Sequence, residues 1–105
     1  MTEKTRKEML EEMLKDDSSD PFLHYGLAME YVASGDDAGA VHQFERLFLV
    51  APDYVPAYLQ AGQALVRLRR QVDARKVFER GIVTAKRTGD AHAAEEMQGM
   101  LLNLG

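Results

Sequence analysis

Apolar residues recur at steps of three and four along most of the chain, which is the spacing of one face of an α-helix. No segment shows the strict alternation that is typical of a strand. The helical stripes lie in six segments, at about 2–16, 21–34, 40–50, 55–69, 72–87 and 90–104. The pattern therefore predicts an all-α protein of about six helices, the first beginning at Thr2.

Short turn signals separate these segments. Residues 35–37 (Gly-Asp-Asp) form a turn that contains a helix N-cap, and Pro52 ends the third stripe because proline cannot continue a helix. Asp53 is predicted to cap the helix at 55–69. Gly89 and Asp90 are predicted as the C-cap of one helix and the N-cap of the next. Such short turns predict antiparallel neighbours.

The middle of the chain repeats itself with a period of 34 residues. At this offset small residues fall on small ones and large on large, as in Ala28 on Gly62, Ala40 on Ala74 and Phe44 on Phe78. The small residues predict close helix crossings, and the phenylalanines are expected to fill the gaps between units. We expect one domain, 1–105, divided into an N-terminal helix and linker at 1–20, repeats at 21–54 and 55–88, and a C-terminal capping helix at 89–105.

These residues resemble the signature of the tetratricopeptide repeat (TPR) family. The matching positions are Leu27, Ala28, Tyr31, Ala40, Phe44 and Pro52 in the first unit and Tyr58, Ala61, Gly62, Leu65, Ala74, Phe78 and Gly81 in the second. His24 stands where the family has an aromatic residue, and His92 occupies the equivalent place, so both are expected to fill that slot. Arg69 replaces the usual glycine between helices. The resemblance implies an α-α superhelix, a TPR solenoid of two full repeats flanked by half-repeats.

Composition excludes several classes of chemistry. The chain has no cysteine, which rules out disulfides and thiolate metal sites. His24, His42 and His92 lack metal-ligand spacing, neighbouring carboxylates are typical of a solvated face, and no glycine loop suits a phosphate. We therefore expect no enzyme, no catalytic residue, no metal and no cofactor.

The termini and apolar runs bear on localisation. Residues 1–20 lack the apolar core of a secretory signal, and the longest apolar run, 47–52, is far shorter than the ~20 residues of a membrane span. A cytoplasmic protein without a membrane partner is expected.

Charge is unevenly distributed along the chain. Residues 67–87 hold eight basic and two acidic side chains, whereas residues 1–66 hold five basic and twelve acidic ones. This basic belt is interpreted as a solvated face, as a docking surface for an acidic partner, or as a contact with the acidic half of a second copy. Nucleic acid is not expected as a partner, because the basic residues are spread over both helices of the second unit and the sequence pI is about 5.3.

The resemblance also implies a site. In TPR proteins the first helix of each unit lines a concave groove in which ligands usually lie. The groove residues implied here are Phe22, Tyr25, Met29, Val32, Leu59, Gln63, Val66 and Arg67. Members that bind chaperone tails have lysine, arginine or asparagine there, so Tyr25, Met29 and Leu59 argue against such a ligand.

The expected function is that of a protein-interaction scaffold. Its partner is expected to be a peptide or helix, apolar with an acidic element, bound in the groove. Two alternatives stay open. A terminal helix could fold over the groove and hide it, or the chain could self-associate as a homodimer or larger homo-oligomer through its acidic and basic faces.

Overall fold

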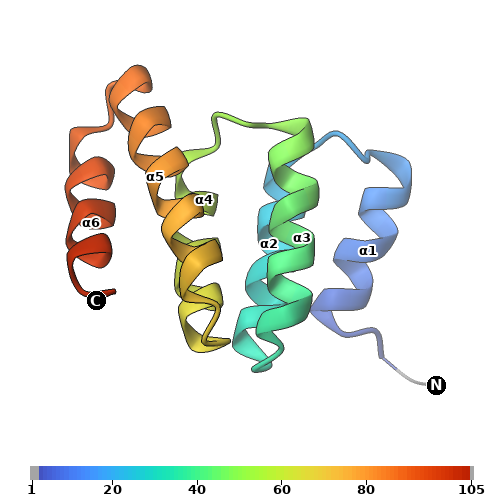
Figure 1. Ribbon diagram of the computed structural model, residues 1–105. Helices are drawn as coiled ribbons and strands as arrows, with labels where there is room; N and C mark the ends of the chain where they lie inside the picture. The colour runs from blue at the N-terminus through green and yellow to red at the C-terminus, as the bar shows by residue number, and fades with distance from the viewer. Residues whose placement is uncertain (1–2, 105) are drawn as a thin grey trace.

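The computed structural model describes residues 3–104, which form six α-helices and contain no strand (Figure 1). The helices are α1 (Arg6–Asp16), α2 (Pro21–Ala33), α3 (Asp37–Val50), α4 (Val55–Arg67), α5 (Gln71–Thr88) and α6 (Ala91–Leu102). Helices that are adjacent in sequence pack together, and α6 also contacts α4. The result is an elongated stack of 49 × 28 × 19 Å with α1 and α6 at opposite ends (Figure 1). The all-α architecture predicted from helical spacing is confirmed.

Side-chain caps fix where most helices begin. The expected start of the first helix, Thr2, lies outside the described residues, and the helix itself begins later, after Thr5. Thr5 and Glu8 form a reciprocal capping box, in which the Glu8 amide donates to Thr5 Oγ1 at 3.1 Å. Asp36, within the predicted turn at 35–37, caps α3, and Asp90 caps α6 as predicted.

The prediction that Asp53 caps α4 is wrong. The N-cap position belongs to Tyr54, which makes no capping bond with its side chain. Asp53 lies one residue too early, and its carboxylate instead pairs with the guanidinium of Arg87 at the end of α5. Pro56 lies in the first turn of α4, where its missing N–H removes one of the donors that a cap would serve.

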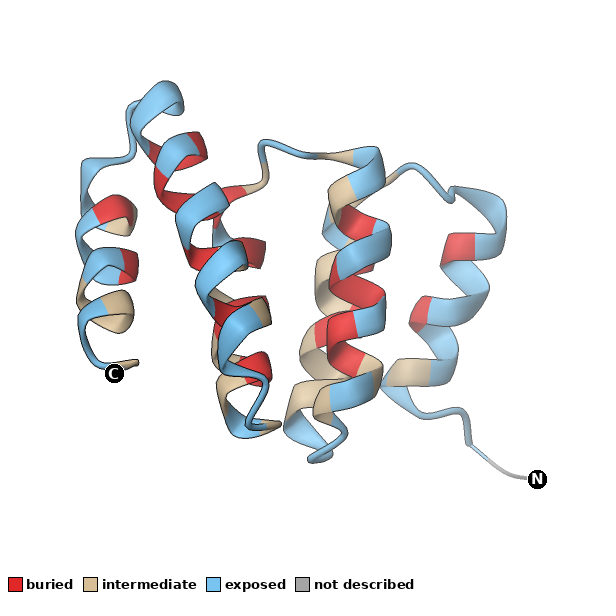
Figure 2. Ribbon diagram, viewed as in Figure 1, coloured by how far each residue is buried: buried red, intermediate tan, exposed pale blue. Residues whose placement is uncertain are grey.

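The core follows the repeat. Ala40, Ala74, Phe44 and Phe78 are fully buried, each pair at equivalent positions of the two units. In Figure 2 the buried positions lie between the helices, while the outward sides of α1, α3 and α5 are exposed. This face of α1, α3 and α5, turned toward the viewer in Figures 1 and 2, is called the outer face below.

One turn contains a strained residue. Arg69 adopts a positive φ of 61°, and its repeat equivalent, Gly35, has a φ of 80°. A side chain in this left-handed region costs roughly 1–2 kcal/mol, which glycine avoids.

We expect Arg69→Gly to raise the free energy of unfolding by about 0.5–1 kcal/mol, because glycine's larger unfolded-state entropy offsets part of the gain. Urea unfolding measures the change. Gly35→Ala is the matched control and should destabilise; a loss of stability in Arg69→Gly would contradict the assignment of strain.

Candidate functional site

The predicted groove residues come from α2 and α4. Tyr25, Met29 and Val32 are half-buried and pack against the cluster that contains Ala57 and Ala61 of α4. Leu59 and Val66 on α4 are also half-buried and pack against the neighbouring cluster, to which Met97 of α6 belongs. Apolar side chains thus run from α2 across α4 to α6, partly open to solvent.

A hollow marks the α4–α6 end of this surface. It has a volume of about 270 Å³ and is lined by Gln63, Val66, Arg67 and Met100. Three of the predicted groove residues therefore lie together, with Met100 contributed by the last helix. Phe22, at the start of α2, is 71% exposed.

Tyr25 belongs to an aromatic cluster whose other members, Tyr54 and Phe44, were not among the predicted groove residues. Its ring stacks on Tyr54 at 5.2 Å between centroids and lies 6.2 Å from the ring of Phe44. Burial raises the pKa of the Tyr25 hydroxyl, and the neighbouring Tyr54 adds to the effect. The stack gives the α2 side of the surface a rigid aromatic platform.

Arg67 already pairs with a carboxylate of its own chain. Its Nε lies 3.0 and 3.1 Å from the two carboxylate oxygens of Asp37, and its Nη2 lies 2.9 Å from Oδ1. Asp37 stands at the start of α3, so this ion pair links the two units. The acidic element expected in the partner stays a prediction, and the guanidinium that suggested it already has a carboxylate of its own chain.

The terminal helices pack at the ends of the stack. Leu10 and Leu14 of α1 pack against Leu27 on α2. Leu27 is two residues from both Tyr25 and Met29, or about 200° around the helix. The main packing of α1 therefore leaves the Tyr25–Met29 side open, and α6 extends the apolar surface instead of crossing it.

His24 fills the aromatic slot with two hydrogen bonds. Its buried imidazole lies 2.7 Å from the Ser18 carbonyl through Nε2 and 2.7 Å from the Gln43 amide nitrogen through Nδ1. A tautomer with the proton on Nε2 donates to Ser18 and accepts from Gln43. Tyr58 is the repeat equivalent and donates to the Pro52 carbonyl at 2.6 Å. Both units thus tie the first helix to the carbonyl six residues earlier.

The corresponding expectation for His92 is wrong. Its side chain is 85% exposed and lies 3.1 Å from Glu96, one turn further along α6. The reason is that α6 is the last described helix, so no second helix covers this position.

The basic belt divides into paired and unpaired cations. Arg67, Arg70 and Arg87 pair with Asp37, Asp73 and Asp53 respectively. Within residues 3–104 no carboxylate lies within 4.0 Å of the other five, which are Arg69, Arg75, Lys76, Arg80 and Lys86. Arg80 lies over the rings of Phe48 and Tyr58 instead.

The Asp53–Arg87 pair predicts a pH effect. Hydrogen bonding from Arg87 lowers the pKa of Asp53. A carboxyl with a lowered folded-state pKa stabilises the fold above its unfolded pKa and loses that contribution as the pH falls through the folded value. We expect Arg87→Gln to raise the pKa of Asp53 toward its ordinary value, measured by carboxyl ¹³C NMR titration. Glu12, whose pKa is lowered chiefly by a hydrogen bond from Lys4, is the internal control and should not move.

The described part of the chain contains neither a metal-binding cluster nor a membrane-spanning helix. Within residues 3–104 no group of three or more histidine and acidic side chains is arranged to hold a metal ion. None of the helices described has the length and apolar character needed to cross a bilayer.

Comparison with known proteins gives the family. No protein-family model matches the chain. A TPR repeat-containing protein of Pseudomonas aeruginosa is 31% identical over 97 residues, covering 92% of each chain.

Solved structures agree with this relationship. The solution structure of a TPR domain protein from Salinibacter ruber is 34% identical, with a TM-score of 0.77 over 84% of this chain and 89% of that one. A protein of Bordetella parapertussis, 24% identical, shares the fold with a TM-score of 0.83 over 97% of this chain and 89% of its own. With the repeat signature and the helix stack, these likenesses show that the chain belongs to the tetratricopeptide-repeat family.

Proposed function

We propose that this protein binds a peptide or helix of a partner protein along the surface formed by α2, α4 and α6. The TPR fold generally mediates protein–protein interaction. The observation that carries the proposal is the run of half-buried apolar side chains from Tyr25 and Met29 on α2, through Leu59 and Val66 on α4, to Met100 on α6. Contiguous apolar surface of this kind is typical of contact sites.

The chemistry of the surface defines the ligand. Met29 and Met100 have flexible, polarizable side chains that adapt to apolar ligands of different shapes. The stacked rings of Tyr25 and Tyr54 offer a flat apolar surface. Gln63 supplies a polar group at the α4–α6 hollow. These features suit an amphipathic helix or an extended segment with apolar anchors.

Substitution of the α2 side tests the proposal. We expect Met29→Glu and Phe22→Glu, each made alone, to reduce capture of the partner in affinity purification from the native host, because a carboxylate would be desolvated against an apolar ligand. Phe22 is 71% exposed, so its replacement should leave helicity and unfolding unchanged. Leu49→Glu is the matched control, since Leu49 lies on α3 and is 85% exposed. If both variants still capture the partner, or if the Leu49→Glu control loses it equally, the surface formed by α2, α4 and α6 is not the binding site.

Self-association is the second candidate function. It is favoured by the exposed Glu11 and Asp16 of α1, which have no basic partner within 4.0 Å in residues 3–104, and by the unpaired cations of α5. Light scattering at low and high salt tests it, because exposed ion pairs weaken with screening. A dimer that dissociates as salt is added supports self-association, and a monomer at every salt concentration rejects it.

A further inference from the structure

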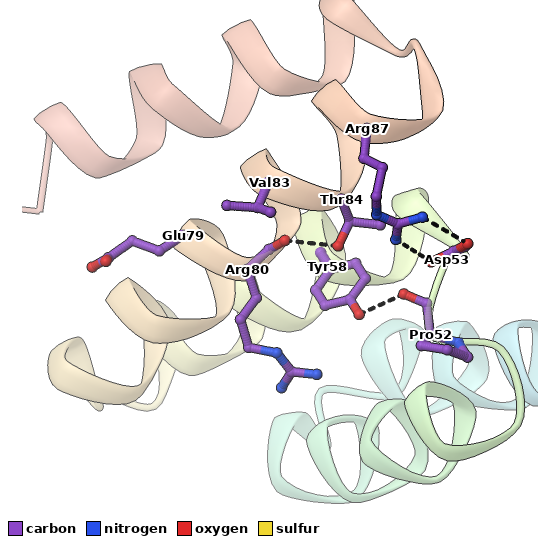
Figure 3. Close-up of a pocket in the computed structure, with 8 residues that line it drawn as sticks. All are labelled: Pro52, Asp53, Tyr58, Glu79, Arg80, Val83, Thr84 and Arg87. Atoms are coloured by element: carbon purple, nitrogen blue, oxygen red, sulfur yellow. Dashed lines mark hydrogen bonds and ion pairs between the residues drawn. The ribbon is translucent and has the colours of Figure 1, made fainter.

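A second hollow, of about 380 Å³, opens on the outer face between α5 and the α3–α4 turn (Figure 3). Pro52 and Tyr58 line one side, and Arg80, Val83 and Thr84 of α5 line the other. None of these residues belongs to the surface formed by α2, α4 and α6. The hollow is therefore separate from that surface.

Arg80 is held in position by aromatic rings. Its guanidinium carbon lies 5.5 Å from the ring centroid of Phe48 and 5.6 Å from that of Tyr58. The two rings stack at 4.3 Å with 17° between their planes, and Tyr58 is fixed by its bond to the Pro52 carbonyl. A cation held over aromatic faces is oriented before a partner arrives, which lowers the entropy cost of binding.

The Arg80 guanidinium has unused hydrogen-bonding capacity. It carries five N–H donors, and within residues 3–104 no carboxylate lies within 4.0 Å of it and no side-chain hydrogen bond involves it. Asp53, which also lines the hollow, is already paired with Arg87. The Glu79 carboxylate points away from Arg80 (Figure 3). The hollow therefore presents a cation without a counter-ion.

The seam between α1 and α3 offers a comparison. It contains a hollow of about 350 Å³ lined by Arg46, the repeat equivalent of Arg80. There the acidic Glu11 lines the same hollow, and Arg46 also donates to the Gln43 side chain at 3.4 Å. Carboxylates line both hollows, but Arg46 has a side-chain acceptor in the chain itself and Arg80 has none among the described residues.

We propose that the Arg80 hollow is a second docking site, which takes a carboxylate side chain from an acidic, partly apolar segment of a partner protein. A planar guanidinium suits bidentate recognition of a carboxylate. Val83, which is 66% exposed at the edge of the hollow, provides an apolar contact beside the charge. Lys76 and Lys86 on the same helix, both exposed, add attraction for an acidic segment.

A nucleic acid fits this site less well. Asp53 and Glu79 line the hollow alongside the two arginines, and they would face a continuous row of phosphates. An acidic protein segment can instead place its carboxylates where the cations are.

A titration followed by NMR tests the site. The probe is a short capped peptide of repeating Glu-Glu-Leu, added to the full ¹⁵N-labelled chain. We expect shift changes centred on Tyr58, Arg80 and Thr84. Arg80→Met, which keeps the apolar stem over the rings, should weaken binding about tenfold, because the charge-assisted hydrogen bonds between the guanidinium and the carboxylate are lost. Arg46→Met, the matched control with the same change of net charge, should bind the peptide like the unaltered chain.

Several outcomes would overturn the proposal. Equal weakening by Arg46→Met would mean diffuse attraction, and equal binding of a Gln-Gln-Leu peptide would mean that carboxylates are not recognised. Arg80-dependent binding of oligothymidylate with similar affinity would assign the site to phosphates. Dimerisation of the chain that Arg80→Met abolishes would make the occupant a second copy. Shift changes confined to Met29 and Val66 would place the peptide on the surface formed by α2, α4 and α6. That surface is tested by substitutions at other residues, so failure of one proposal does not imply failure of the other.

Discussion

Replacing Phe78 with alanine is expected to lower the free energy of unfolding by about 3–5 kcal/mol, the usual cost of emptying a phenylalanine site in a core. Phe78 is fully buried where α5 packs on α4, inside the cluster that also holds Tyr58 and Met97. The stability of a whole domain is about 5–15 kcal/mol, so the variant should unfold at much lower urea concentration. Phe22→Ala is the control, and it should change stability by less than about 0.5 kcal/mol because this ring is already exposed.

Gly62 lies against the ring of Phe78 and allows a second test of the same packing. A Cβ added at Gly62 would lie 2.3 Å from the nearest atom of the Phe78 ring, so Gly62→Ala should destabilise the unaltered protein by about 1–3 kcal/mol. In the Phe78→Ala background that clash is gone, and alanine is the better helix former by about 1 kcal/mol. The same substitution should then stabilise. A double-mutant cycle in urea measures this change of sign, and a loss of equal size in both backgrounds would contradict the packing described.

The fold could be predicted from the sequence because the packing of repeats is local and periodic. A helix pair of this kind buries its stripe against the next pair, so equivalent positions must have similar volumes. For this reason the 34-residue offset of Phe44 and Phe78 predicted two fully buried core positions. Arg69 also follows the repeat, because the backbone keeps the positive φ that the turn requires although the glycine found at the equivalent position of the first unit is missing.

Contacts between distant polar side chains were not predictable in the same way. Arg87 pairs with Asp53 and Arg67 with Asp37 across 34 and 30 residues, and a long flexible side chain can reach several partners. The sequence therefore suggested a cap for Asp53, which is not observed, and it did not indicate that Arg67 pairs with Asp37. The stack of Phe48, Tyr58 and Arg80 depends on how successive units overlap, which residue spacing alone does not give. The groove residues remain a prediction, since whether they bind a ligand depends on a partner.

Replacing His24 with alanine is expected to cost about 2–4 kcal/mol, more than its size alone would suggest. The change leaves a cavity and also removes the partner of the Gln43 amide at 2.7 Å and of the Ser18 carbonyl at 2.7 Å. A buried polar group that loses its partner costs roughly 1–3 kcal/mol, and Gln43 is almost completely buried. Tyr58→Phe, the control in the second unit, keeps its ring and loses one bond to Pro52, so it should cost only about 1 kcal/mol.

The paired variant His24→Phe with Gln43→Leu separates the polar contribution from the packing one. Phenylalanine fills the slot with the aromatic type usual in the family, and leucine removes the amide that would otherwise be left without a partner. Replacing both members of a buried hydrogen bond by apolar groups of similar shape can be nearly neutral. We therefore expect the double variant to unfold within about 1 kcal/mol of the unaltered protein, while His24→Phe alone is clearly weaker. Additive losses in the two single variants would mean that His24 and Gln43 are not energetically coupled, and that the hydrogen bond between them contributes little.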